Sequence, residues 1–230
     1  MAKPIFSTLP TGDFVLASSS ATRVKLLEDA GLGFCQYPVS IDEGAIRAAG
    51  IAEAIPAREI VVMIAEMKAA VAVQRLDTEH LVPPVYVLGC DQILVCDDII
   101  YSKPKDISAA KSQLLALSGK THQLLTAVVL FQHGKRIWHH LSIADMTMHQ
   151  LDGKFIDFYL ERLGKAAFFS PASYQIESIG VQLFSQIKGC HYAILGIPML
   201  ELMAILREHG LSPLDKKSQN KSEGKAGCIS

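Results

Sequence analysis

The chain has 230 residues, of which 50% are hydrophobic and 20% are charged, so it is long enough to bury a substantial core. Its formal net charge of -1 at pH 7 excludes the strongly basic surface that binds duplex nucleic acid, and any phosphate site must therefore be local. No apolar run approaches the roughly 18 residues of a membrane span, and no secretory signal begins the sequence, so we expect a cytoplasmic protein without membrane or nucleic-acid partners.

The first predicted elements are a strand over 14–17 and a helix that is capped by Ser20 and stops at Gly31. The turn between them contains Ser18, and Arg23 lies in the first turn of the helix. Free backbone N–H groups and the positive dipole end of a helix start, next to a guanidinium, make a site for phosphate. An ordinary capped helix is the alternative, because the turn has no glycine-rich phosphate loop.

A strand over 34–41 follows, and after Asp42 and Glu43 a long helix is predicted between Pro56 and about Arg75. Lys68 lies on this helix, one position past its apolar stripe. A solvent-exposed lysine is the ordinary interpretation of that position.

Asp91 is the main catalytic candidate, because it directly follows a buried strand predicted over 85–88. Open α/β sheets bind their ligands at the ends of strands. A turn aspartate is the alternative. Asp97-Asp98 then predicts the turn of a β-hairpin over 93–101, after which comes Lys103.

The second half continues the alternation of strands and helices. We expect a helix capped by Ser108 and ending at Gly119, two strands joined at His133-Gly134, a helix over 155–163, a site-forming loop over 170–189 with a short strand at 181–184, and a last helix over 199–209. This order predicts an α/β fold in a single domain over 1–215, followed by a disordered polar tail over 216–230.

Several acids lie at or near predicted element ends, namely Asp42, Glu43, Glu66, Asp91 and Glu177. Carboxylates together with substrate phosphate oxygens are the usual ligands of magnesium, so two or three of these acids would make a metal site if they converged. Their spacing alone does not establish that they do.

The order of these motifs over residues 13–212 resembles the Maf family of nucleotide pyrophosphatases, also called septum formation proteins. Eight blocks carry the resemblance: Leu16 to Arg23 with Leu26-Leu27, Asp42-Glu43, Ala65 to Ala69, Gly89 to Gln92, Ser102 to Pro104, Leu117 to His122, Ser173 to Glu177, and Ile187 to Gly189 with Leu195 to Pro198. The resemblance implies a mixed, strongly twisted sheet flanked by helices, with two lobes around a central cleft. It also implies cleavage of a nucleoside triphosphate to monophosphate and pyrophosphate with a divalent cation, magnesium or manganese.

The resemblance also implies a role for each site residue. Asp91 is the catalytic aspartate and shares the metal with Glu43, and the substrate-binding positions are Ser18, Ser20, Arg23, Glu43, Lys68, Gln92, Lys103 and Glu177. The chain departs from the family's Ser-x-Ser-Pro-Arg-Arg, since it has Ser-x-Ser-Ala-Thr-Arg at 18–23. One basic contact is therefore missing or is supplied elsewhere, and Lys25 is a candidate.

Two further departures concern the base. Gln92 replaces the family's usual threonine, and Glu177 replaces a glutamine, as in the branch that acts on 7-methyl-GTP rather than on dTTP and UTP. A carboxylate can accept hydrogen bonds from both N1–H and the amino group of guanine, a donor pair that uracil and thymine lack.

In the mechanism that we expect, Asp91 holds the attacking water or the metal that delivers it, while the cationic groups neutralise the triphosphate. A nucleotide-binding regulator of cell division that has lost catalysis is the first alternative. An aspartyl-phosphate phosphatase is a weaker one, because that chemistry uses a second acid two residues on and position 93 is Ile93. The sequence leaves the oligomeric state open, with a homodimer as one alternative.

Overall fold

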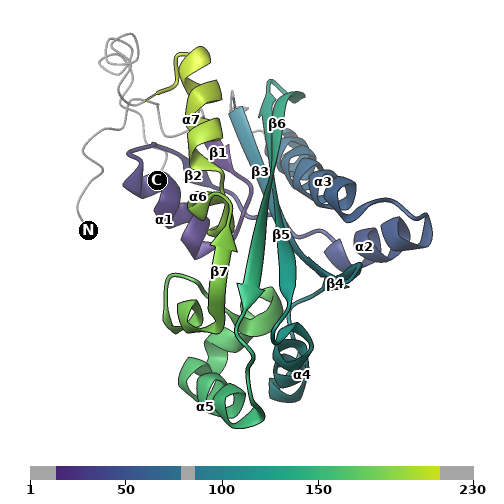
Figure 1. Ribbon diagram of the computed structural model, residues 1–230. Helices are drawn as coiled ribbons and strands as arrows, with labels where there is room; N and C mark the ends of the chain where they lie inside the picture. The colour runs from purple at the N-terminus through teal and green to yellow at the C-terminus, as the bar shows by residue number, and fades with distance from the viewer. Residues whose placement is uncertain (1–13, 79–85, 213–230) are drawn as a thin grey trace.

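A seven-stranded mixed sheet forms the centre of the computed structural model, which describes residues 14–78 and 86–212 (Figure 1). Six strands follow the order β2-β1-β3-β5-β6-β7, and β4 pairs with β3. β1 is parallel to both β2 and β3, and the other pairings are antiparallel. The fold is therefore the mixed α/β type that the sequence predicts. The predicted tail over 216–230 lies outside the described residues.

The described strands are β1 (Phe14–Leu16), β2 (Cys35–Gln36), β3 (Tyr86–Cys96), β4 (Ile99–Tyr101), β5 (Thr121–Gln132), β6 (Lys135–Met148) and β7 (Phe184–Lys188). The described α-helices are α1 (Ala21–Asp29), α2 (Glu43–Ala52), α3 (Ala57–Thr78), α4 (Ile107–Leu117), α5 (Gly153–Leu163), α6 (His191–Ile194) and α7 (Met199–Glu208). Three 3₁₀ segments lie between α5 and β7: η1 (Gly164–Phe168), η2 (Pro171–Ser173) and η3 (Ile179–Leu183).

The upper lobe consists of the sheet with α1, α2, α3, α6 and α7 (Figure 1). α3 covers one face of the sheet, where Ile64 and Ala65 pack against Val87 and Ile93. α1 and α7 cover the other face. The strands in the middle are buried on both faces, which is why β3 and β5 consist of nearly continuous apolar residues.

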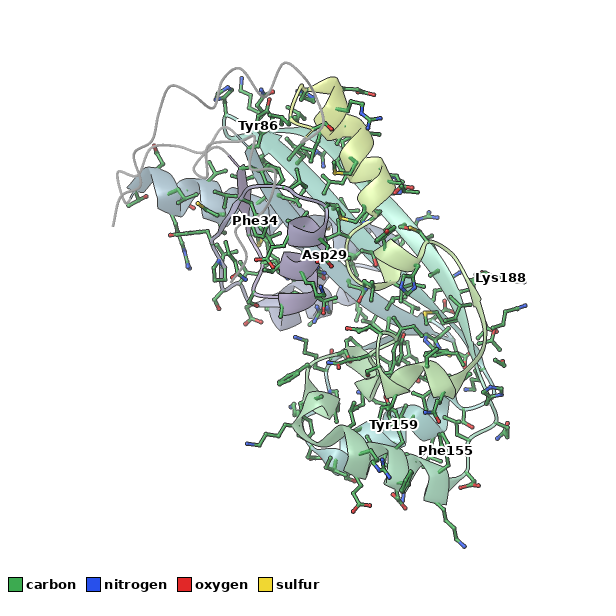
Figure 2. All side chains as sticks on the ribbon, turned by 90° about the vertical axis from the view of Figure 1, so that its left-hand side faces the viewer. Asp29, Phe34, Tyr86, Phe155, Tyr159 and Lys188 are labelled. Atoms are coloured by element: carbon green, nitrogen blue, oxygen red, sulfur yellow. The ribbon has the colours of Figure 1, made fainter. Side chains whose placement is uncertain are left out.

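The lower lobe consists of α4, α5 and the segments η1, η2 and η3. Its apolar core is separate from the two cores of the upper lobe and includes Leu114, Tyr159 and Leu183. The ends of β3 and β6 also enter this core, through Leu94 and Met146. In Figure 2, Tyr86 marks the upper lobe and Tyr159 the lower one. The long strands thus connect the two lobes.

The strand that contains Asp91 is longer than we predicted. β3 runs without a break from Tyr86 to Cys96, so Asp91 lies in the middle of a strand and not after its end. The polar pair Asp91-Gln92 suggested a break, but both residues keep their ladder partners on β5. Gly89 is also part of this strand. A side chain at this position would clash with the Ala65 carbonyl oxygen, because α3 approaches the strand closely here.

Four further boundaries differ from the prediction. α2 was not predicted at all, and β2 covers only two residues of the strand expected over 34–41. α4 is capped by Asp106, whose carboxylate accepts a hydrogen bond from Ala109 N at 2.8 Å, and not by Ser108. The strand expected over 181–184 is a 3₁₀ turn, and β7 begins only at Phe184. Short elements like these depend on tertiary contacts more than on local pattern.

Candidate active site

The candidate site is a cavity of about 930 Å³ between the two lobes. It lies where one edge of β3 has no neighbouring strand. β1 pairs with β3 only as far as Leu88, and β4 begins to pair at Leu94. Asp91 lies in the middle of this gap and lines the cavity. Because β1 ends at Leu16 while β3 continues to Cys96, the crevice beside Asp91 lies just past the carboxyl end of the parallel strand β1.

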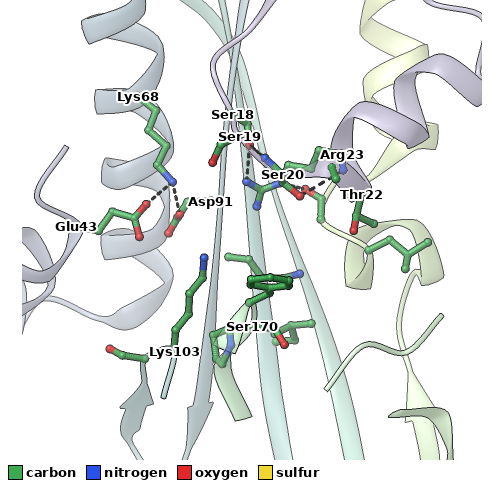
Figure 3. A pocket seen from close by; sticks show the side chains of 18 of the residues that line it. Ser18, Ser19, Ser20, Thr22, Arg23, Glu43, Lys68, Asp91, Lys103 and Ser170 are labelled. Carbon is green, nitrogen blue, oxygen red and sulfur yellow. Dashed lines mark hydrogen bonds and ion pairs between the residues drawn. The ribbon is translucent and has the colours of Figure 1, made fainter. Parts of the chain in front are cut away.

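The turn after β1 forms one wall of the cavity (Figure 3). Ser20 caps α1 as predicted, since its Oγ accepts a hydrogen bond from Arg23 N at 3.4 Å. Ser18 Oγ accepts from Ser20 N at 3.3 Å and from Arg23 Nη1 at 3.2 Å. The serines therefore fix the turn and one end of the guanidinium.

Arg23 is 8% exposed, and backbone oxygens hold it in place. Its Nη1 donates to Cys90 O and its Nε donates to Gly196 O, both at 3.0 Å. Gly196 has φ +113, and a Cβ there would lie 2.9 Å from Arg23 Nε. Only glycine suits this close approach and this backbone conformation. The buried guanidinium is thus oriented without a carboxylate partner among the described residues.

The opposite wall contains a cluster of paired charges from α2, α3 and β3. Lys68 Nζ lies 2.8 Å from Asp91 Oδ1 and 2.6 Å from Glu43 Oε1 (Figure 3). The absence of a side chain at Gly89 lets α3 approach β3 closely enough for the contact with Asp91. Lys68 is 9% exposed, so the solvent-exposed alternative for this residue is wrong.

Arg47 belongs to the same cluster and was missed by the sequence analysis. It lies one turn after Glu43 on α2, and its Nη2 is 2.7 Å from Glu43 Oε2 and 3.7 Å from Asp91 Oδ2. Burial alone would raise the pKa of Glu43, but the charges and hydrogen bonds of Lys68 and Arg47 outweigh it and lower that pKa below 4.5. Glu43 is therefore a carboxylate at neutral pH.

One carboxylate oxygen of Asp91, Oδ2, accepts no hydrogen bond from the described residues. The Asp91 side chain is 6% exposed, and this oxygen is buried. Buried oxygens of this kind are rare in proteins, and they occur at sites that bind water, ions or substrate. Within the described ranges no group of three or more His, Cys, Asp or Glu could hold a metal ion by itself. Any cation here would need ligands from the substrate as well.

Lys103 follows β4 and lines the cavity from below, with its side chain pointing toward Asp91 (Figure 3). It is exposed and forms no ion pair with any carboxylate that the structure describes. Its ammonium group is therefore available to a ligand.

Gln92 also lines the cavity, but its amide nitrogen is already hydrogen-bonded to other parts of the protein. It points away from the Asp91 face of β3, and its Nε2 donates to Thr126 Oγ1 at 2.8 Å and to the carbonyl oxygens of Ala193 and Ile194 at 3.1 Å. A ligand would therefore meet Gln92 through Oε1.

The lower lobe closes the cavity through the segment that leads from Phe169 to Glu177. Glu177 is exposed, and its Oε1 accepts a hydrogen bond from Thr22 Oγ1 at 3.5 Å. Aromatic side chains line this end as well, namely Tyr101, Phe169 and Tyr174. The cavity thus has a cationic part near β3 and an aromatic part with one carboxylate near the lower lobe.

A buried histidine supports the aromatic part from behind. His122 Nε2 lies 3.0 Å from Tyr174 Oη, and burial lowers the pKa of His122 to about 4. Burial also raises the pKa of the Tyr174 hydroxyl. Both groups are therefore neutral near pH 7, and the pair fixes the ring that lines the cavity.

All nine residues to which the family resemblance assigns a role line this one cavity: Ser18, Ser20, Arg23, Glu43, Lys68, Asp91, Gln92, Lys103 and Glu177. Two weaker suggestions are wrong. Lys25 pairs with Asp29 at 2.9 Å on the exposed side of α1, and Glu66 pairs with Arg136 at 2.7 Å outside the cavity. Neither of them contributes to the site.

Comparison with known proteins points to one family. A family model described as "Maf-like protein" matches residues 13–209. The chain is 40% identical over 196 residues to a "Nucleoside triphosphate pyrophosphatase" of Paramagnetospirillum magneticum, which covers 85% of this chain and 98% of the relative. It is 44% identical over 197 residues to a "7-methyl-GTP pyrophosphatase" of Brucella suis, covering 86% of this chain and 96% of the relative. Of the helices in the described ranges, none is long and apolar enough to cross a membrane.

Proposed function

Because the chain belongs to the Maf family, we propose that it hydrolyses nucleoside triphosphates to the monophosphate and pyrophosphate. The observation that carries the proposal is the convergence of four cationic side chains on the cavity that contains Asp91, namely Arg23, Arg47, Lys68 and Lys103. A triphosphate is the kind of ligand whose charge such a set can neutralise.

The reaction needs a water molecule aimed at the α-phosphorus and charge stabilisation on the phosphates. Asp91 is the acceptor for the water proton, because its Oδ2 is buried and free of hydrogen bonds within the described structure. Lys68 keeps Asp91 in place through Oδ1. Arg23 and Lys103 approach the ligand from the other sides of the cavity, and their charges are not used by a described carboxylate. Arg23, Lys68 and Asp91 are held by hydrogen bonds before the substrate arrives, and preorganised groups of this kind are the most effective in electrostatic catalysis.

A divalent cation fits the donor set. Glu43 and Asp91 are both bound to Lys68 Nζ, so the two carboxylates lie on the same side of the cavity, and Asp91 has an unused oxygen. Magnesium is typically held by one or two carboxylates together with substrate phosphates and waters. Glu43 would hold the ion while Asp91 Oδ2 accepts the water proton, and the ion would supply further charge stabilisation for the phosphates.

We propose that the base is guanine and that 7-methyl-GTP is the preferred substrate. Glu177 lines the end of the cavity opposite the charge cluster and has a carboxylate that can accept from N1–H and the amino group of guanine. Methylation at N7 gives the base a positive charge, which both this carboxylate and the neighbouring aromatic rings attract. Some relatives are named for 7-methyl-GTP and others for nucleoside triphosphates in general.

The test is a panel of canonical and modified nucleoside triphosphates, each incubated with the purified full-length chain and with magnesium or manganese. We expect pyrophosphate release, fastest with 7-methyl-GTP and slower with dTTP and UTP. The variant Asp91→Asn keeps the shape of the side chain and should lower kcat about 100- to 1000-fold. Unchanged turnover in this variant would remove Asp91 from the mechanism.

Tight binding of triphosphates without any pyrophosphate release would contradict the proposal. That outcome would favour a nucleotide-binding regulator instead. Equilibrium binding of each nucleotide, measured beside its hydrolysis, separates the two functions.

A further inference from the structure

Arg47 is the one cation of the charge cluster that no motif of the sequence indicated. Its side chain is 17% exposed, lines the cavity and lies one helical turn after Glu43 on the same face of α2. Its Nη2 is 2.7 Å from Glu43 Oε2 and 3.7 Å from Asp91 Oδ2. Arg47 is therefore adjacent to the group proposed to activate water.

Most of the donors of Arg47 are unused. A guanidinium has five N–H groups, and Arg47 donates only through Nη2 in the hydrogen bonds found among the described residues. Its Nε is buried and has no partner in that part of the chain. A buried donor without an acceptor is costly, and such groups in folded proteins call for an explanation, such as a bound water, an ion or a catalytic role.

Two other cations of the cavity, Lys68 and Arg23, already donate hydrogen bonds to protein atoms. Lys68 Nζ already contacts both Glu43 and Asp91, and Arg23 donates to two backbone oxygens and to Ser18. Arg47 is thus the half-buried cation of the charge cluster whose guanidinium keeps several N–H groups without an acceptor among the described residues. The planar fork of a guanidinium matches two oxygens of a phosphate group.

The sequence also shows a position that has lost a cation. Thr22 stands where the family pattern has an arginine, and its hydroxyl contacts Glu177. Lys25, the nearest basic residue after Arg23, is on the far side of α1 and outside the cavity. Arg47 comes from a different element and supplies a positive charge to the same cavity.

We propose that Arg47 is a phosphate-binding residue that binds the non-bridging oxygens of the α-phosphate, an inference that rests on the proposed function. In the reaction the water oxygen forms a bond to the α-phosphorus and its proton passes to Asp91. The bond from the α-phosphorus to the bridging oxygen breaks, and its electron pair stays on the pyrophosphate. Because Arg47 lies beside Asp91, on the side from which the water attacks, its unused N–H groups bind the negative charge that builds up on the non-bridging oxygens of the α-phosphorus. Because the charge develops during the reaction, Arg47 stabilises the transition state more than the bound substrate.

The experiment compares Arg47→Gln with the matched control Arg136→Gln. Both variants remove an arginine that pairs with a glutamate at 2.7 Å, but Arg136 lies outside the cavity. Calorimetric titration with a nucleoside triphosphate whose α,β-bridging oxygen is replaced by a methylene group, with and without magnesium, measures binding independently of turnover. We expect Arg47→Gln to weaken binding of this analogue about 10- to 100-fold and to lower kcat, and Arg136→Gln to change neither. Arg47→Lys should restore part of the binding, since it returns the charge without the fork.

Wild-type affinity for the methylene analogue in Arg47→Gln would overturn the inference. A lower kcat with that affinity unchanged would make Arg47 a positioning residue for Glu43 and Asp91 instead. Thermal unfolding of each variant identifies a loss of folding, and Arg47→Lys then provides the test. Failure of the wild-type protein to release pyrophosphate would instead contradict the proposed function, and the binding comparison would still be interpretable.

Discussion

The two walls of the cavity differ in how their charges are paired. The paired wall is made by α2, α3 and β3, and on it the carboxylates of Glu43 and Asp91 form ion pairs with Lys68 and Arg47. The unpaired wall is made by the turn after β1 and by the loop after β4. On it, Arg23 and Lys103 have no carboxylate partner among the described residues.

This difference indicates what each wall does. Paired charges hold one another and stay in place without a ligand, as an organised catalytic group requires. Unpaired cations gain a partner only when an anion binds. Changes to the paired wall should therefore affect folding and turnover, whereas changes to the unpaired wall should affect substrate binding.

The largest effect is expected from Lys68→Met on the paired wall. The substitution keeps the length of the side chain but leaves Glu43 and Asp91 without their shared cation. Breaking a buried ion pair in this way costs about 3 kcal/mol in the free energy of unfolding, and we expect kcat to fall about 100-fold or more. Urea denaturation and pyrophosphate release measure the two effects. The matched control is Lys111→Met, because Lys111 pairs with Asp157 outside the cavity.

The same variant should change the dependence on pH. The pKa of Glu43 is lowered in the folded protein, so its contribution to stability is present above the ordinary pKa of a glutamate and is lost as the pH falls through the folded pKa. Without Lys68, one of the two cations that lower this pKa is lost, so the pKa rises. We expect the acid limb of the pH–rate profile, and the onset of acid unfolding, to move to higher pH. Identical profiles in the variant and the wild type would show that the pairing has no functional role.

A smaller effect is expected from Lys103→Ala on the unpaired wall. Lys103 has no described carboxylate partner to leave behind, so the midpoint of thermal unfolding should stay the same. Loss of one charge-assisted contact should raise KM about 10-fold and change kcat less. Lys105→Ala is the control, because Lys105 is equally exposed and does not line the cavity. A lower stability with unchanged KM would assign Lys103 to the fold and not to substrate.

Much of the site could be predicted from the sequence because short local motifs carry it. The serine cap of α1 and Arg23 occur within six residues, and the same local geometry that fixes the cap fixes the guanidinium. The family resemblance then related these residues to Lys68, Asp91 and Lys103, which lie far apart in the chain. All of them line one cavity, although their roles stay a prediction.

The geometry around Asp91 could not be predicted in the same way. Periodicity treats a polar pair in an apolar run as the end of a strand, but β5 supplies ladder partners and Lys68 supplies the charge that keeps Asp91 in a buried strand. Those partners are 23 to 36 residues away in sequence, so no local window contains them.

α2 was missed for a related reason. It contains two glycines and only one buried residue, Gly50, so it has no apolar stripe that would indicate a helix. It is held by the Asp42 cap, by the ion pair between Glu43 and Arg47, and by Ile46, which packs against the core on the α3 side of the sheet. Arg47 was therefore missed together with its helix, and a candidate cation was sought in the sequence near Arg23 instead.

The smallest effect is expected from Lys25→Ala, which separates closeness in sequence from closeness in space. Lys25 is two residues from Arg23, but its side chain is 73% exposed and pairs with Asp29 at 2.9 Å. An exposed pair at this spacing contributes about 0.3–0.5 kcal/mol, and less with lysine on the N-terminal side. We expect KM, kcat and pyrophosphate affinity to match the wild type, with a shift in the unfolding midpoint near the limit of detection. A KM raised as far as in Lys103→Ala would mean that α1 presents Lys25 to the substrate, and the distinction between the two walls would then no longer hold.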